Sequence, residues 1–208
     1  MEIDSELRNG VMNSLPEAMK IVDVELRNQV YDARALSLSK SSFKLIEDIP
    51  AKGGPETPAI LGGTQADHLN GVARIAVAMA TALKETIGSF QVDLDEVRAG
   101  GLCHDLGKAF EFDPENRKRW SDDPAMTGFP SMRHTLYGVH IALSAGLPEK
   151  IAHIAGAHSP EGGFIIRSLA CDIVHLADEA FWHLLGKGDR LEGDVLHWEE
   201  VVKNLPKP

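Results

Sequence analysis

The residues best suited to chemistry in this chain are the neighbours His104 and Asp105, in the run His-Asp-Leu-Gly-Lys. An imidazole nitrogen and a carboxylate both bind divalent metal ions, and the two oxygens of Asp105 allow it to bridge two of them. The pair follows an apolar segment, where an unpaired imidazole or carboxylate would be costly to bury. The doublet therefore predicts a metal site near the end of an apolar helix.

Other candidate ligands stand on apolar, helix-like segments on both sides of the doublet. They are His68, His134, His158 and Asp178. Four histidines and two carboxylates suit one or two divalent ions, and iron, manganese, cobalt, nickel and zinc all accept these donors. The residue types thus predict a metal cofactor, and two ions per chain if every candidate is used.

Spacing leaves several of these choices open. Asp172 and Asp178 are six residues apart, a rotation of about 240° on a helix, so both cannot face one metal. The residue not used would suit a hydrogen bond to an imidazole N–H. Two pairs of histidines raise the same question, His134 with His140 and His153 with His158.

Together these residues resemble the HD superfamily of metal-dependent phosphohydrolases, whose pattern is H…HD…D. The resemblance runs from about residue 64 to residue 186. It favours Asp178, because Leu176-Ala177-Asp178 is similar to the L-A-D turn that completes the family's metal shell. It implies two sets of ligands, with His68, His104, Asp105 and Asp178 for a first metal and Asp105, His134 and His158 for a second, as in the dinuclear members.

The resemblance also implies that Lys108 is catalytic together with Asp105, because a lysine at this position often contacts the substrate's phosphate or other oxyanion. A simpler reading is a solvated cation just past a helix C-terminus, where the helix dipole favours positive charge. A basic cluster follows and is predicted to screen an anionic substrate as part of a lid. It consists of Arg117, Lys118, Arg119 and Arg133.

The implied function is hydrolysis of a small phosphoester or related anionic substrate by a metal-activated water. No G-x-S-x-G motif and no reactive cysteine context offers a protein nucleophile. The ligand set also resembles that of inositol oxygenase and the phosphonate-cleaving oxygenases, which bind two irons with four histidines and two aspartates. A mixed-valent diiron oxygenase is therefore the alternative. A non-catalytic binding module is the second alternative. The pattern departs from the HD-GYP phosphodiesterases, because His158 is not doubled and no Gly-Tyr-Pro follows.

Composition narrows the choice of partners. The formal net charge of −10 argues against binding duplex nucleic acid or an anionic membrane surface, and leaves a small anionic substrate as the expected partner. Cys103 and Cys171 stand in separate apolar runs and are expected to be reduced, buried thiols. The acidic N-terminus does not resemble a targeting peptide, and no apolar run is long enough for a membrane span, so we expect a cytoplasmic protein. The sequence does not indicate an oligomeric state.

The elements that must position these residues are helices. We expect one all-α domain over residues 1–208, an HD-type helical bundle with an extension at 1–63, a metal-binding core at 64–186 and a tail at 187–208. A Gly- and Pro-rich loop is expected at 49–63 and an irregular insertion at 110–133. The expected helices cover 4–45, 64–87, 93 or 95 to 107, 134–145, 148–157, 165–185 and 199–205.

Overall fold

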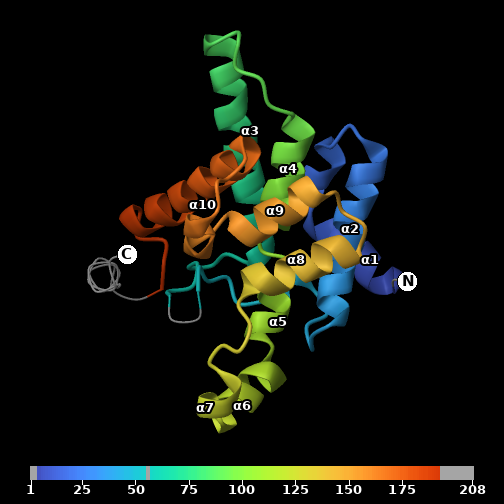
Figure 1. Ribbon diagram of the computed structural model, residues 1–208, viewed down its shortest axis with the longest axis vertical. Helices are drawn as coiled ribbons and strands as arrows, with labels where there is room; N and C mark the ends of the chain where they lie inside the picture. The colour runs from blue at the N-terminus through green and yellow to red at the C-terminus, as the bar shows by residue number, and fades with distance from the viewer. Residues whose placement is uncertain (1–3, 55–56, 193–208) are drawn as a thin grey trace.

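The computed structural model describes residues 4–54 and 57–192, which fold into helices joined by turns (Figure 1). Within these residues there is no β-sheet, only two isolated bridges. The all-α class is therefore confirmed. The helices are α1 (Ser5–Ser14), α2 (Val24–Ser39), α3 (Gln65–Thr86), α4 (Leu94–Cys103), α5 (Lys108–Phe112), α6 (Pro114–Asp122), α7 (Pro124–Thr127), α8 (His134–Ser144), α9 (Glu149–Ala157) and α10 (Leu169–Lys187), with short 3-10 helices at Pro16–Lys20, Ile46–Asp48 and Pro160–Phe164.

Helices α3 and α4 form the centre of the bundle. Helix α3 packs against both α4 and α10, while α8 packs against α9 (Figure 1). The backbones of α3 and α4 approach closely at Gly101, where a Cβ atom would lie 2.7 Å from the Cα atom of Ala73. This close approach needs glycine. It brings the N-terminal turn of α3 beside the end of α4, where the doublet follows.

The N-terminal extension is helical, as expected, but it is not one segment from residue 4 to residue 45. Pro16 opens a separate 3-10 helix, and Asp23 starts α2 by accepting hydrogen bonds from the backbone N–H groups of Glu25 and Leu26. A proline at N1 and an aspartate N-cap both begin helices, so the chain starts anew at each of them. Helix α2 then packs against α4, which makes the extension part of the core.

Several of the expected elements are present. Thr64 caps α3 in a capping box with Asp67, as its sequence predicts. The segment 49–63 is free of regular helix where it is described, and two isolated bridges tie it down, Lys52 to Ala59 and Ile60 to Leu191. Helix α10 begins at Leu169 rather than at residue 165, because the Ser168 side chain caps it by accepting from the Cys171 N–H. The helix expected at 199–205 lies outside the described residues.

Two expectations around the doublet were wrong. Helix α4 ends at Cys103 rather than at Gly107, and the segment 110–133 is not irregular throughout, because α5, α6 and α7 lie in and beside it. Pro114 and Pro124 suggested a loop, yet both occupy the first turn of a helix, where proline costs no hydrogen bond. In Figure 1 these three helices project from the lower end of the bundle.

Within the part of the chain that the structure describes, no helix combines the length and the apolar character that a membrane span needs.

Candidate metal centre

The structure brings the six predicted ligands into one cluster inside the bundle. His68 lies in the first turn of α3, His104 and Asp105 follow α4, and His134 opens α8. His158 follows α9, and Asp178 lies in the middle of α10. The four histidine side chains and Asp105 are at most 3% exposed, and that of Asp178 is 19% exposed. Five separate segments thus meet at one buried point.

Side chains of helix α2 hold the doublet in place by donating hydrogen bonds to backbone carbonyls in and beside it. The Arg34 guanidinium donates through Nε and Nη2 to the Leu102 carbonyl (2.8 and 2.5 Å) and through Nη1 to the Asp105 carbonyl (3.1 Å). Ser37 donates to the Leu106 carbonyl at 2.5 Å. These side chains satisfy carbonyls at the end of α4 in place of a further helical turn, which explains why the helix stops at Cys103.

The last residue of the turn after α4, Gly107, must be small. A Cβ atom on Gly107 would lie 2.0 Å from the His134 carbonyl oxygen, so only glycine lets the turn after α4 meet the start of α8. The Gly in His-Asp-Leu-Gly-Lys therefore serves the approach of His134 to the doublet.

Asp105 divides its two oxygens between two pairs of histidines. Oδ2 lies 3.1 Å from His68 Nε2 and 3.3 Å from His104 Nε2. Oδ1 lies 3.5 Å from His134 Nε2 and 3.7 Å from His158 Nε2. A carboxylate placed in this way has the geometry of a ligand that bridges two cations.

Asp178 completes the side of the cluster formed by His68 and His104. Its Oδ1 lies 3.5 Å from His68 Nε2 and 3.9 Å from His104 Nε2, and this buried oxygen has no hydrogen-bond partner among the described residues. The competing residues stay outside. Asp172 is exposed, with Arg167 Nη1 4.0 Å away, His140 is exposed, and His153 accepts a hydrogen bond from the Ser168 N–H.

Hydrogen bonds at Nδ1 turn the Nε2 atoms of three histidines toward the cluster. His104 Nδ1 lies 2.8 Å from the Gly101 carbonyl, and His134 Nδ1 lies 2.7 Å from Glu111 Oε2. His158 Nδ1 lies 3.2 Å from the Ile154 and Ala155 carbonyls. These oxygens can only accept, so each Nδ1 carries a proton, and the neutral form of each ring presents the lone pair of Nε2 to the cluster.

The cluster therefore collects lone pairs with few protons between them. The Nε2 atoms of His68 and His104 face each other at 3.0 Å, beside two carboxylates. A metal–nitrogen bond of about 2.0–2.1 Å puts neighbouring ligand atoms about 3 Å apart, close to these separations. Two groups have donor atoms within 4.8 Å of one another and could hold a metal ion, His68 with His104 and Asp178, and His104 with Asp105 and His158.

Comparison with known proteins identifies the family of this chain. The sequence model of the HD domain family matches residues 66–180, more than half of the chain. The chain belongs to the HD domain family. No curated protein and no solved structure matches it. The matched region begins two residues before His68 and ends two residues after Asp178, so all six candidate ligands of this HD domain lie inside it.

Burial and charge set the protonation of the HD cluster. Burial lowers the pKa of His68 to about 4, so its imidazole is neutral near pH 7. Burial opposes ionisation of Asp105, but Lys108 and His104 outweigh it and hold the pKa of this carboxyl well below its usual range. The pKa of Asp178 is lowered as well, because His104 and His68 outweigh the cost of burial. Burial opposes protonation of His104, but Asp105 and Asp178 outweigh it and raise the pKa of this imidazole. Neutral imidazoles and ionised carboxylates are the forms that bind metals, so a metal would displace the proton of His104.

Glu111 is a supporting residue that the sequence analysis missed. It is fully buried on α5, and its Oε2 accepts from both the backbone N–H (3.2 Å) and Nδ1 (2.7 Å) of His134. Its other oxygen pairs with Arg133, which also pairs with Glu161 at 2.6 Å. Its position could have indicated this role, because Glu111 is an acidic residue in the apolar run Ala109-Phe110-Glu111-Phe112. The prediction of an irregular segment from residue 110 hid this pattern.

Lys108 lies inside the HD site. Its Nζ is 2.8 Å from Asp105 Oδ2, donates to the Lys52 carbonyl, and lies 5.8 Å from the centre of the Trp182 ring. The lysine is 2% exposed, so it is not a solvated cation past the end of a helix, which was the alternative interpretation of the sequence. Its predicted contact with a substrate stays a prediction.

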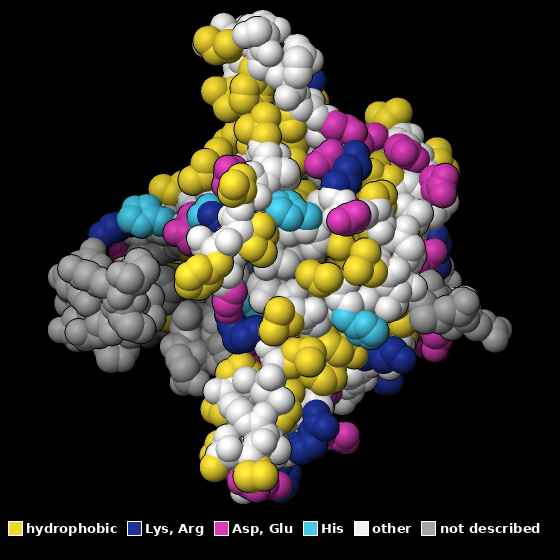
Figure 2. Space-filling model, viewed as in Figure 1, with side chains coloured by type: hydrophobic (Ala, Val, Ile, Leu, Met, Phe, Trp, Pro, Cys, Tyr) yellow, Lys and Arg dark blue, Asp and Glu magenta, His cyan; other side chains and the backbone are white. Residues whose placement is uncertain are grey.

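The predicted basic cluster divides in two. Arg133 lies next to His134 in the ion-pair network just described. The other three residues lie on α6 and contact neighbours there rather than the ligands. Lys118 pairs with Asp122, Arg119 donates to Asn116, and Arg117 lies over the Phe129 ring. Figure 2 shows Lys and Arg side chains next to acidic ones on this lower part of the molecule.

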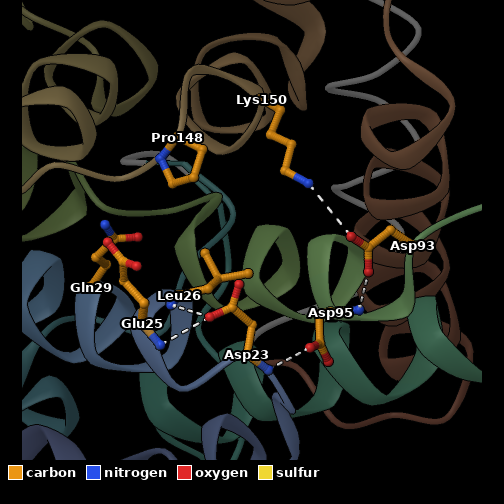
Figure 3. Close-up of a pocket in the computed structure, with 8 residues that line it drawn as sticks. All are labelled: Asp23, Glu25, Leu26, Gln29, Asp93, Asp95, Pro148 and Lys150. Carbon is orange, nitrogen blue, oxygen red and sulfur yellow. Dashed lines mark hydrogen bonds and ion pairs between the residues drawn. The ribbon is translucent and has the colours of Figure 1, made fainter.

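A hollow of about 310 Å³ lies away from the ligands, where the N-termini of α2, α4 and α9 meet (Figure 3). Its three aspartates are already engaged. Asp23 caps α2, Asp95 accepts from the Val22 and Asp23 N–H groups, and Asp93 pairs with Lys150 at 3.5 Å. These groups hold three helix starts together, so the buried cluster is the stronger candidate for chemistry.

Proposed function

We propose that this HD-domain protein is a metal-dependent hydrolase that acts on a small phosphoester or related anionic substrate. The observation that carries the proposal is the division of Asp105 between two pairs of histidine Nε2 atoms. HD domains are generally metal-dependent hydrolases. When bound at these residues, divalent ions such as iron or manganese would lower the pKa of a water molecule and hold the oxygens of the substrate.

The protein's own groups complete the site without a protein nucleophile. Burial raises the pKa values of Cys103 and Cys171 to about 12, so neither thiol is ionised near neutral pH. His68 is neutral near pH 7, a bound metal would displace the proton that the neighbouring carboxylates favour on His104, and Glu111 holds the ring of His134 in one orientation. The reaction therefore uses water as its nucleophile.

Lys108 is the proposed contact for the anionic group of the substrate. Its ammonium group has three donor protons, and the Asp105 oxygen and the Lys52 carbonyl use two of them. The Trp182 ring lies beside it, and a Cβ atom on Gly53 would lie 3.7 Å from this ring. A small anion is the partner that this arrangement favours, in preference to duplex nucleic acid or a membrane.

The test is reconstitution of metal-free protein under nitrogen with Mn²⁺, Fe²⁺, Co²⁺, Ni²⁺ or Zn²⁺ in turn. Release of product from small phosphomonoesters and phosphodiesters is then measured without oxygen. We expect turnover with at least one metal and none after chelation. Failure of every metal and ester to react would refute the proposal and favour the non-catalytic binding module.

Lys108→Met is the matching variant, because methionine retains the length of the apolar stem. A charge-assisted contact contributes about 1.5 to 3 kcal/mol, so kcat/KM should fall roughly ten- to a hundredfold. Metal content should not change, and Lys44→Met, at an exposed lysine outside the predicted basic cluster, is the control. Unchanged kcat/KM would remove Lys108 from the proposed mechanism.

The second candidate function is a diiron oxygenase. Four histidines and two aspartates around a bridging carboxylate also suit a mixed-valent iron pair, and this set meets here in one cluster. The two functions differ in what they require. Turnover that needs both iron and dioxygen, with a coupled iron pair visible by electron paramagnetic resonance, would replace hydrolysis by oxygenation.

A further inference from the structure

Gln65 is a buried polar residue of the site with no role so far. It is the first residue of α3, one turn before His68, and it is fully buried. Its Nε2 donates to Asp105 Oδ2 at 2.9 Å. Its Oε1 is buried and has no hydrogen-bond partner among the described residues.

The orientation of this amide is fixed by its neighbour. An ionised carboxylate only accepts hydrogen bonds, so the Gln65 NH₂ group must face Asp105 and the carbonyl oxygen must face the other way. Turning the amide would set two acceptors against each other. The group without a partner is therefore an acceptor, held next to the carboxylate that both pairs of histidines share.

A buried acceptor without a partner is costly, and native proteins rarely keep one. The contact with Asp105 explains the Nε2 end of the side chain alone. A residue needed only to support Asp105 would not require a second polar atom in the interior. Oε1 therefore has no donor among the described residues, and a molecule that enters the site can supply one.

We propose that Gln65 is a catalytic residue whose Oε1 accepts a hydrogen bond from the water that attacks the substrate. The inference rests on the proposed hydrolytic function. By accepting a hydrogen bond from one O–H of the water, the amide oxygen directs a lone pair of the water at the reacting atom. The amide remains neutral throughout, so it orients the nucleophile and does not remove its proton.

The first test does not depend on turnover. A crystal structure of the full chain loaded with Mn²⁺ should show an ordered solvent molecule within hydrogen-bond distance of Gln65 Oε1. An Oε1 that accepts from a protein group, or that faces only carbon atoms, would overturn the inference. This result is decided even if the protein hydrolyses no phosphoester.

The second test is Gln65→Met, which conserves length and removes both polar atoms, with the exposed Gln91→Met as control. We expect kcat per bound Mn²⁺ to fall roughly ten- to a hundredfold, with KM and metal content unchanged. An activity loss that only follows a loss of metal would mean that Gln65 merely supports Asp105. A rise in KM at constant kcat would mean that it binds substrate instead. If the wild-type protein hydrolyses no ester, the proposed function fails and the crystal structure alone decides the role of Gln65.

Discussion

At the scale of single residues, the site is organised by the partners of the imidazole rings. Glu111 fixes His134 through Nδ1, much as backbone carbonyls fix His104 and His158. Burial opposes ionisation of the Glu111 carboxyl, but the hydrogen bond and charge of His134, together with Arg133, outweigh burial and lower its pKa. It is therefore an ionised acceptor near neutral pH, which makes the imidazole of His134 a stronger ligand.

Glu111→Ala should weaken the second metal selectively. Loss of a carboxylate that orients a ligand typically lowers metal affinity by roughly ten- to a hundredfold. The first metal keeps its own ligands. Titration followed by elemental analysis should show two metals per chain in the wild type and one tight metal in the variant. The exposed Glu115→Ala is the control. Equal loss of both metals, or a wild-type stoichiometry that saturates at one, would contradict the dinuclear assignment.

Asp105→Ala should abolish most metal binding and leave the helical circular dichroism largely intact. The structure adds a consequence, because Lys108 then loses its buried carboxylate partner. Breaking a buried pair from one side costs about 3–5 kcal/mol. Asp105→Ala combined with Lys108→Met should therefore be more stable to urea than Asp105→Ala alone. A double variant less stable than the single one would show that Lys108 is not held by this pair.

At the scale of elements, α2 is the least expected contributor to the site. Its sequence shows only a helical pattern, and nothing in that pattern tells that Arg34 crosses to the end of α4. The guanidinium is buried among backbone carbonyls, so it acts as a cap supplied by another helix. The N-terminal extension thereby belongs to the metal site without providing a ligand.

Arg34→Met should destabilise the fold and loosen the doublet together. Removing the guanidinium leaves the Leu102 and Asp105 carbonyls without these donors, at about 1–3 kcal/mol each. We expect a lower free energy of unfolding in urea and weaker binding of both metals. Arg27→Met, on the same helix, removes only a hydrogen bond to the Ile21 carbonyl and should leave metal binding unchanged. Wild-type metal affinity in Arg34→Met would contradict the capping role.

The sequence predicts the ligands of the site better than the bounds of the helices that carry them. Residue types and helical spacing predicted a metal site but left several ligands open. The resemblance to the HD superfamily selected Asp178, His134 and His158, and the structure gathers that set. The end of α4 depended on long-range bonds from Arg34 and Ser37, which no local pattern carries. Helices α6 and α7 were missed because Pro114 and Pro124 can either break a helix or begin one.

At the scale of the whole molecule, the cluster ties together segments from most of the chain. Its ligands come from the start of α3, the turn after α4, the start of α8, the end of α9 and the middle of α10. The imidazole nitrogens and carboxylates converge on one point, and the Lys108 ammonium pairs with only one of the carboxylate oxygens, so a cation would find several donor atoms here. Bound metal should therefore stabilise the folded chain as a unit, because the unfolded chain does not present this site.

Removal of metal should accordingly lower the melting temperature. Free metal at a hundred times its Kd stabilises the folded state by about 2.7 kcal/mol, and in a chain of this size each kcal/mol shifts Tm by roughly 2–4 °C. Calorimetry with and without a chelator should thus differ by about 5–10 °C. Asp105→Ala should show no such difference, because the carboxylate shared by both pairs of histidines is gone. An equal shift in that variant would mean that the stabilising metal binds elsewhere, and the absence of a shift in the wild type would mean that the buried cluster takes up no metal.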